Sequence, residues 1–97
     1  MTPPPVRRVV LDLLKPHEPG TVEFARRVAG ADGVSGVNAT VLEVDAEVEN
    51  VKLTVEGEDV DVAAVQAVIA ELGGSLHSVD QVACGDHLVE ESPTPQD

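Results

Sequence analysis

The sequence is poor in aromatic residues and in cysteine, and each shortage narrows what the chain can be. Its 97 residues include one Phe, no Tyr and no Trp, so the core must be built from aliphatic side chains. The single cysteine, Cys84, excludes an internal disulfide and a cysteine-only zinc site. A reactive thiol needs an electropositive setting, so we expect Cys84 to be a small, half-buried strand residue instead.

Basic residues and long apolar runs are scarce as well. Six Lys and Arg residues stand against 18 Asp and Glu residues, which gives a net charge of −12. This balance argues against nucleic-acid binding, which needs Lys and Arg to neutralise phosphates, and against binding to an anionic membrane surface. No run approaches the roughly 18 apolar residues of a membrane span. The N-terminal apolar run is broken by Asp12 and ends at Lys15, unlike a signal peptide, so we expect a cytoplasmic protein.

The acidic excess has two interpretations. It can belong to a cation-binding protein, or it can keep the surface solvated at high salt. Because the bias is spread along the whole chain and only two residues, Lys15 and Lys52, are lysines, we favour salt adaptation for most of the carboxylates.

The hydrophobic pattern predicts a single domain over residues 6–89, flanked by extended tails over 1–5 and 90–97. Alternating apolar residues predict strands, helical spacing predicts helices, and Thr21 and either Asp59 or Asp61 are suitable N-caps. The expected strands are 6–14, 37–45, 50–56 and 75–83, and the expected helices are 21–30 and 61–72. The βαββαβ order indicates an α+β, ferredoxin-like fold: a four-stranded antiparallel sheet of order 4-1-3-2 with both helices on one face.

Strand alternation also assigns residues to the two faces of the sheet, although a bulge would shift any of them by one position. The residues expected on the helix-covered face are Val9, Leu11, Leu13, Thr40, Leu42, Val44, Leu76 and Val82. The residues expected on the open face include Val10, Asp12, Leu14, Val41, Glu43, Asp45, Lys52, His77, Val79 and Gln81.

The apolar residues expected on the open face suggest contact between subunits. The second and fourth strands are the edges of such a sheet, and proteins usually cover long apolar edges. If the second strand of one copy pairs with the fourth strand of another, the contact is heterologous and can close into a ring. The alternative is a monomer whose tails fold over the sheet.

Several carboxylates and one histidine are candidate ligands for a divalent cation, calcium or magnesium. Hard cations take oxygen ligands, and a carboxylate–histidine set can also hold a metal or orient a general base. The candidates are Asp12, Glu43, Asp45, His77 and Asp80, of which Asp80 would need a bulge to join the others. Residues 45–56 carry carboxylates at EF-hand positions, but Asn50 replaces the glycine and the flanking segments are expected strands rather than helices, so we do not expect an EF-hand. A solvated acidic turn remains the alternative.

The segment Lys15-Pro-His-Glu-Pro19 is a candidate ligand-binding loop between the first strand and the first helix. Its two prolines stiffen the loop, and a cation beside an imidazole can bind an anion or donate a proton. Lys15, His17 and Glu18 are the candidate contacts; the alternative is a rigid crossover whose histidine caps a neighbouring group. No catalytic residues and no organic cofactor are predicted, although an enzyme using His17 or His77 is a third interpretation.

Several segments together resemble a known family. They are Leu11-Asp-Leu-Leu-Lys-Pro-His-Glu-Pro19, Gly36-Val-Asn38 with Glu43-Val-Asp45, Gly73-Gly-Ser-Leu-His-Ser-Val-Asp80 and Thr94-Pro-Gln-Asp97. From about Arg8 to the end, the chain is similar to archaeal domain-of-unknown-function family 211. The resemblance implies a stand-alone ferredoxin-like domain of no established activity, a ring-forming oligomer and a divalent-cation site. The extra acidity resembles a haloarchaeal version.

Two functions are therefore expected. The first is a cytoplasmic, homo-oligomeric binding module with a calcium or magnesium site. The second is a small-molecule sensor similar to amino-acid-binding ACT domains, which share this element order and usually bind ligand near the first strand–helix loop. In this chain that loop carries Pro and His where Gly would allow close backbone approach.

Overall fold

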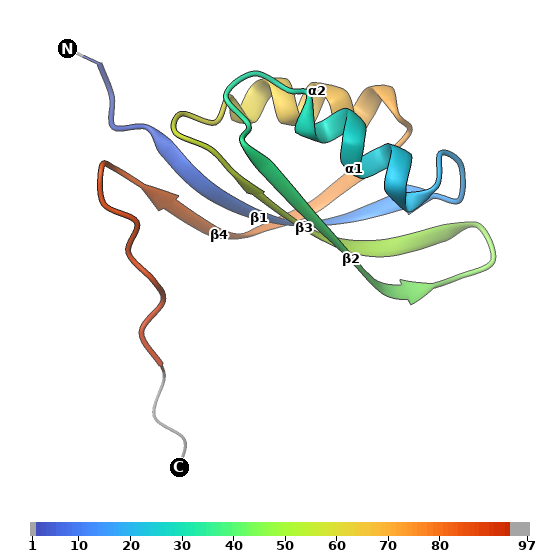
Figure 1. The fold of residues 1–97 in the computed structure, drawn as a ribbon. Coiled ribbons are helices and arrows are strands. Elements are labelled where there is room, and N and C mark those ends of the chain that lie inside the picture. Colours follow the sequence, from blue (N-terminus) through green and yellow to red (C-terminus); the bar gives the residue numbers. More distant parts are fainter. Residues whose placement is uncertain (1, 94–97) are drawn as a thin grey trace.

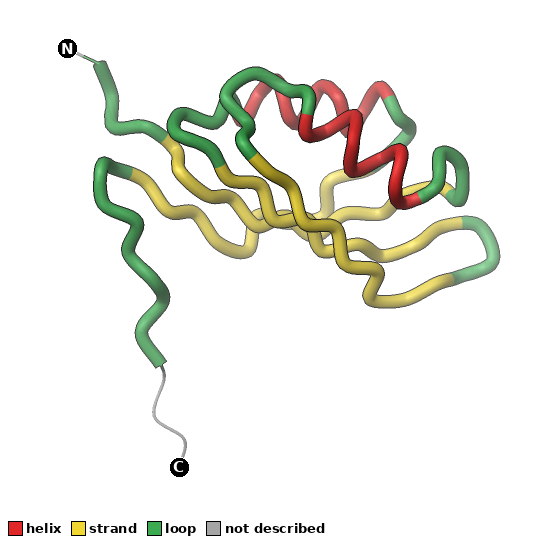
Figure 2. The backbone as a smooth tube through the Cα atoms, viewed as in Figure 1, coloured by secondary structure: helices red, strands yellow, loops and turns green. Residues whose placement is uncertain are grey.

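The computed structural model describes residues 2–93 as a four-stranded antiparallel sheet covered on one face by two helices (Figures 1 and 2). The elements are β1 (Val6–Pro16), α1 (Thr21–Ala29), β2 (Gly36–Val44), β3 (Val48–Glu56), α2 (Val62–Glu71) and β4 (Ser75–Cys84). The strand order β2-β3-β1-β4 is the predicted order read from the opposite edge. The α+β class is confirmed, and the βαββαβ arrangement matches a ferredoxin-like fold. Residues 1 and 94–97 of the predicted tails lie outside the described residues.

The ends of the helices follow from local chemistry. Gly20 is the N-cap of α1, so Thr21 is its first residue rather than its cap. Of the two predicted caps of α2, Asp61 is the one observed, because its carboxylate accepts a hydrogen bond from the Ala64 N–H at 3.0 Å. Gly73 follows α2 with a φ of 85°, a left-handed conformation that favours glycine.

The core lies between the helices and the two central strands. Val9, Leu11 and Leu13 of β1 lie opposite Val55, Leu53 and Val51 of β3, respectively, and all six side chains are buried. From the helices, Phe24 and Val28 of α1 and Val65 and Ile69 of α2 complete the core. Each such side chain contributes roughly 1.5 to 3 kcal/mol when fully buried. The predicted face assignment of β1 and the aliphatic character of the core are thus confirmed.

The predicted faces of β2 are wrong over its first half. Val41 lies opposite the buried Val51, so it faces the helices, and Thr40 lies opposite Lys52 on the open face. The register shifts between Val41 and Glu43, and beyond this irregularity Glu43 lies opposite Asn50 on the open face, as predicted. The prediction assumed that side chains alternate between the two faces without interruption, and the bulge breaks this alternation.

Two further bulges correct the prediction for β4. The register places Val79 opposite Leu11, on the helix side and not on the open face. It shifts between Gln81 and Val79 and again between Ser78 and Leu76, so Asp80 and His77 are the inserted residues. Cys84 is the last residue of β4 and is exposed rather than half-buried.

Contacts between the start of β1 and the segment after β4 hold the two ends of the domain together. The Gly85 N–H donates to the Pro5 carbonyl at 2.8 Å, and the Arg7 guanidinium donates to the carbonyls of Gly85 and Asp86. The C-terminal segment then leaves the sheet on the side away from the helices (Figure 1). In the described part of the chain, no helix is long and apolar enough to cross a membrane.

Candidate functional site

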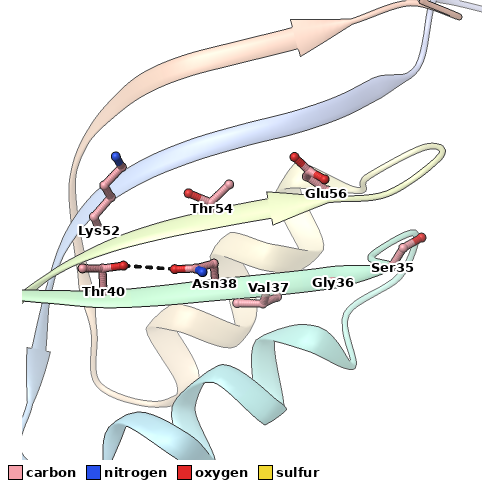
Figure 3. Close-up of a pocket in the computed structure, with 8 residues that line it drawn as sticks. All are labelled: Ser35, Gly36, Val37, Asn38, Thr40, Lys52, Thr54 and Glu56. Carbon is pink, nitrogen blue, oxygen red and sulfur yellow. Dashed lines mark hydrogen bonds between the residues drawn. The ribbon is translucent and has the colours of Figure 1, made fainter. Parts of the chain in front are cut away.

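Three regions could carry function: the open face of the sheet, a cluster of charged side chains at one end of β1, and the two edge strands. The open face is polar between β2 and β3, because Val41 faces the helices, whereas Val10 and Leu14 of β1 lie on the open face as predicted. Between β2 and β3 it carries a hollow of about 680 Å³, lined on β2 by Asn38 and Thr40 and on β3 by Lys52, Thr54 and Glu56 (Figure 3). The Thr40 hydroxyl donates to the Asn38 amide oxygen at 3.0 Å.

The predicted cation ligands are distributed over the open face and the β2–β3 turn. Asp12 accepts a hydrogen bond from the Asn50 side-chain amide, and Asp80 accepts one from the Ser78 hydroxyl at 2.7 Å. The bulge brings Asp80 to a second hollow of about 550 Å³ that Lys52 also lines. Glu43, Asp45 and His77 are exposed. Within residues 2–93, no group of three or more His, Cys, Asp or Glu side chains is placed to hold a metal ion.

Lys15 lies near the C-terminal end of β1, on the helix-covered face, and its side chain is 0% exposed. Its ammonium donates to the carbonyl oxygens of Pro16 and Pro19, each at 2.7 Å, and lies 3.4 Å from a carboxylate oxygen of Glu49. The ring of Phe24 lies 5.9 Å away, within cation–π range. Two hydrogen bonds and the nearby carboxylate together compensate the charge of the buried ammonium.

His17 and Glu49 extend this cluster to the β2–β3 turn. The His17 Nδ1 lies 2.9 Å from the second carboxylate oxygen of Glu49, and Nε2 lies 3.0 Å from the Ala46 carbonyl oxygen. The hydrogen bond to Glu49, aided by the Ala46 carbonyl, raises the pKa of His17 above its ordinary value. The same bond to His17, aided by Lys15, lowers the pKa of Glu49.

Lys15 and His17 are among the predicted ligand contacts, whereas Glu49, the carboxylate that joins them, is not. The strand register places Glu49 directly opposite Lys15, on the helix-covered face. The predicted first strand ends at residue 14 and the predicted third strand begins at residue 50. The pairing of Lys15 with Glu49 therefore lies just outside both predicted strands. Glu18, the third predicted ligand contact, is exposed. The ligand-binding role of this loop stays a prediction.

A second charged cluster lies near the N-terminal end of β1, on the open face. The Arg8 guanidinium donates to Glu56 at 2.6 Å and to both carboxylate oxygens of Glu90 at 2.9 and 3.1 Å. Hydrogen bonding to Arg8 lowers the pKa of Glu90, and the two carboxylates raise the pKa of Arg8. This cluster ties the C-terminal segment to the sheet.

The edge strands carry most of the exposed large apolar side chains of residues 2–93. Six of the nine lie in β2 or β4; they are Val41, Leu42, Val44, Leu76, Val79 and Val82. Each edge strand has one residue of formal charge, Glu43 in β2 and Asp80 in β4. Long apolar edges with few charges are open to pairing with another strand.

Comparisons with known proteins give a relationship but no activity. The model of the DUF211 family, described as "Uncharacterized ArCR", matches residues 7–97. An uncharacterized protein of Methanocaldococcus jannaschii is 48% identical over 92 residues, which cover 95% of each chain. Neither description names a ligand or a reaction.

Proposed function

We propose that this chain, which belongs to the DUF211 family, is a homo-oligomeric binding module that assembles through its edge strands. The observation that carries the proposal is the concentration of exposed apolar side chains on β2 and β4. The net charge of −12 makes two copies repel each other elsewhere, so contact is least costly where the surface is apolar and nearly uncharged.

The strand directions favour a head-to-tail contact. β1 runs antiparallel to β3 and β4, and β3 runs antiparallel to β2, so β2 and β4 run in opposite directions. A β4 edge placed against the β2 edge of a second, similarly oriented copy therefore forms an antiparallel pair. A pair of copies joined in this way still has a free β2 edge at one end and a free β4 edge at the other. Further copies can add in the same way, and the chain of copies can close into a ring.

We also propose that the predicted divalent cation binds between copies at this junction. Glu43 lies on the open face of β2, and Asp80 lines a hollow on the open face of β4. Two carboxylates brought together across a junction repel each other unless a cation lies between them. Calcium or magnesium, which take carboxylate oxygens, would serve there, with His77 as a neighbouring group.

The geometry favours assembly over the alternative of a sensor similar to ACT domains. Such a sensor would need free polar groups in the β1–α1 loop. In this loop Lys15 is buried and donates to two carbonyl oxygens, and both ring nitrogens of His17 already contact the protein. The remaining carboxylates suit a surface solvated at high salt, and we propose that role for most of them.

Light scattering coupled to size-exclusion chromatography tests the assembly. Leu42→Lys and Val79→Lys each place a charge on an edge strand, at side chains that are 56% and 48% exposed. Val22→Lys is the matched control, because Val22 is 69% exposed but lies on α1. We expect oligomers for the wild type and the control in about 1 M KCl, where the charge is screened, and monomers for the two edge variants. A monomeric wild type at roughly 100 µM would overturn the proposal.

The cation is tested by the same measurement with calcium or with a chelator. We expect calcium to stabilise the wild-type oligomer against dilution, and Glu43→Gln to remove this dependence. Glu47→Gln, a change at an exposed carboxylate in the β2–β3 turn, is the control and should keep it. Equal behaviour of the two variants would reject Glu43 as a ligand.

A further inference from the structure

We propose that His17, when doubly protonated, is a clasp that fixes the β2–β3 turn to the β1–α1 loop, and that loss of one proton releases it. The clasp joins segments that are far apart in the sequence, since His17 is 29 residues from Ala46 and 32 from Glu49. Figure 1 shows the β1–α1 loop and the β2–β3 turn at the same end of the molecule.

The proton count follows from the partners of the ring. The Ala46 carbonyl can only accept a hydrogen bond, and an ionised Glu49 carboxylate can only accept one as well. Both lie at hydrogen-bond distance from a ring nitrogen, at 3.0 and 2.9 Å. A neutral imidazole has a single N–H and can satisfy one of them. Only the imidazolium satisfies both partners at once.

The charges around the ring support the protonated form. Glu49 from β3 faces the ring directly, and Lys15 from β1 contacts the other oxygen of the same carboxylate. In the turn, Asp45 and Glu47 flank Ala46 in the sequence and are exposed. Glu18 of the loop is also exposed. The one cation in this set, Lys15, is held by Glu49, so the surroundings of the ring are negative overall.

The pKa of His17 is consistent with this geometry. The hydrogen bond to Glu49 and the Ala46 carbonyl both raise it, against a smaller effect of burial. The ring therefore stays protonated at a higher pH than an ordinary exposed histidine.

Release of the clasp reaches the edge strand through the turn. Leu42 and Val44 are exposed apolar residues at the end of β2 that leads into this turn. A freed turn loosens that end of the edge, so we infer that assembly weakens as His17 loses its proton. This last step rests on the proposed function, whereas the clasp itself does not.

Nitrogen-detected NMR of the histidine rings tests the clasp in the intact protein. We expect His17 to titrate above the ordinary histidine value of 6.5, with both ring nitrogens protonated below its midpoint. Glu49→Gln should lower the midpoint of His17, because it removes the carboxylate that accepts from Nδ1. A wild-type His17 that titrates at or below 6.5 would overturn the proposal without any variant.

Hydrogen exchange tests the release. The Asp45 amide donates to the Val48 carbonyl at 2.8 Å and reports on the turn. Relative to the wild type at pH 6, we expect about threefold faster exchange of this amide in His17→Gln, as for loss of an exposed ion pair. His87→Gln, the matched control, should leave the rate unchanged. An unchanged rate in His17→Gln would show that His17 does not hold the turn.

Oligomer mass against pH separates the two proposals. With a working clasp, the wild-type mass should fall as the pH rises through the His17 midpoint, and the mass of His17→Gln should be lower and independent of pH. A monomer at every pH, with the NMR results intact, would reject assembly but keep the clasp. An oligomer whose mass does not change with pH would reject regulation by the clasp but would support the proposed assembly.

Discussion

The two ends of β1 carry two charged clusters that are built alike but placed differently. Each pairs a β1 cation with the β3 carboxylate directly opposite, Arg8 with Glu56 and Lys15 with Glu49. Each also recruits a third group from a distant segment, Glu90 in one case and His17 in the other. The Arg8 cluster lies on the open face with exposed carboxylates, whereas the Lys15 cluster is under the helices with its cation fully buried.

The difference shows that the same pairing has different consequences in water and in the core. An exposed ion pair is weakened by solvent and salt, and adds little stability. A buried ammonium has already lost its hydration, so removing a partner leaves a desolvated group without compensation. We therefore expect the Lys15 cluster to govern stability and the Arg8 cluster to govern only where the C-terminal segment lies.

The largest expected effect is that of Lys15→Met, which keeps the shape of the side chain but removes three hydrogen-bond donors. The Pro16 and Pro19 carbonyls lose their partner, and Glu49 loses one of its two cations. We expect a loss of about 3 kcal/mol in the free energy of unfolding and a melting temperature lower by more than about 10 °C. Arg8→Met, measured beside it by calorimetry, should shift the melting temperature by only a few degrees. Equal shifts would end the distinction between the two clusters.

An intermediate effect is expected from pH. The His17 pKa lies above its ordinary 6.5, so its contribution is complete below that pH and is lost as the pH rises through the raised value. The Glu49 pKa lies below its ordinary 4.5, so its contribution is complete above that pH and is lost as the pH falls through the lowered value.

The wild type should therefore exceed His17→Gln in melting temperature most clearly between about pH 4.5 and 6.5. The difference should shrink toward pH 9. Arg8→Gln should show no such change between pH 6 and pH 9, because Arg8 and Glu90 both keep their charge there. Thermal melts followed by circular dichroism over this range check the prediction, and a constant difference for His17→Gln would contradict it.

The smallest expected effect is that of salt on the exposed cluster. The small destabilisation caused by Arg8→Gln should disappear between about 0.05 and 1 M KCl, since exposed charges are screened. The effect of Lys15→Met should persist over the same range. Melting temperatures at several salt concentrations give the answer, and a salt-dependent Lys15→Met would mean that water reaches Lys15.

The sequence was sufficient for the order of elements and for the faces of the central strands. Val9, Leu11 and Leu13 alternate with polar or open-face residues, and both neighbours of β1 pair with it over most of its length. The sequence offered Asp59 and Asp61 as caps of α2, and Asp61 is the cap, through a contact within its own helix. These features depend on residues close in the sequence, whose periodicity the chain displays directly.

The faces of the edge strands and the buried contact between Lys15 and Glu49 could not be predicted in this way. A bulge adds one residue without any required sequence change, so the faces of Val41 and Val79 could not be read from alternation. The Lys15–Glu49 contact joins residues 34 positions apart and depends on where two strands end. Because Lys15 next to Pro16 is typical of a loop, its burial on the core side gave no local signal.

A mixing experiment tests the head-to-tail assembly most directly. Leu42→Lys blocks the β2 edge and leaves β4 free, whereas Val79→Lys blocks the β4 edge and leaves β2 free. If the contact joins β4 of one copy to β2 of the next, each variant alone is monomeric, and an equimolar mixture forms a one-to-one heterodimer that grows no further. Native mass spectrometry with one variant isotope-labelled resolves these species. A mixture that stays monomeric, or a dimer of either variant alone, would contradict the account.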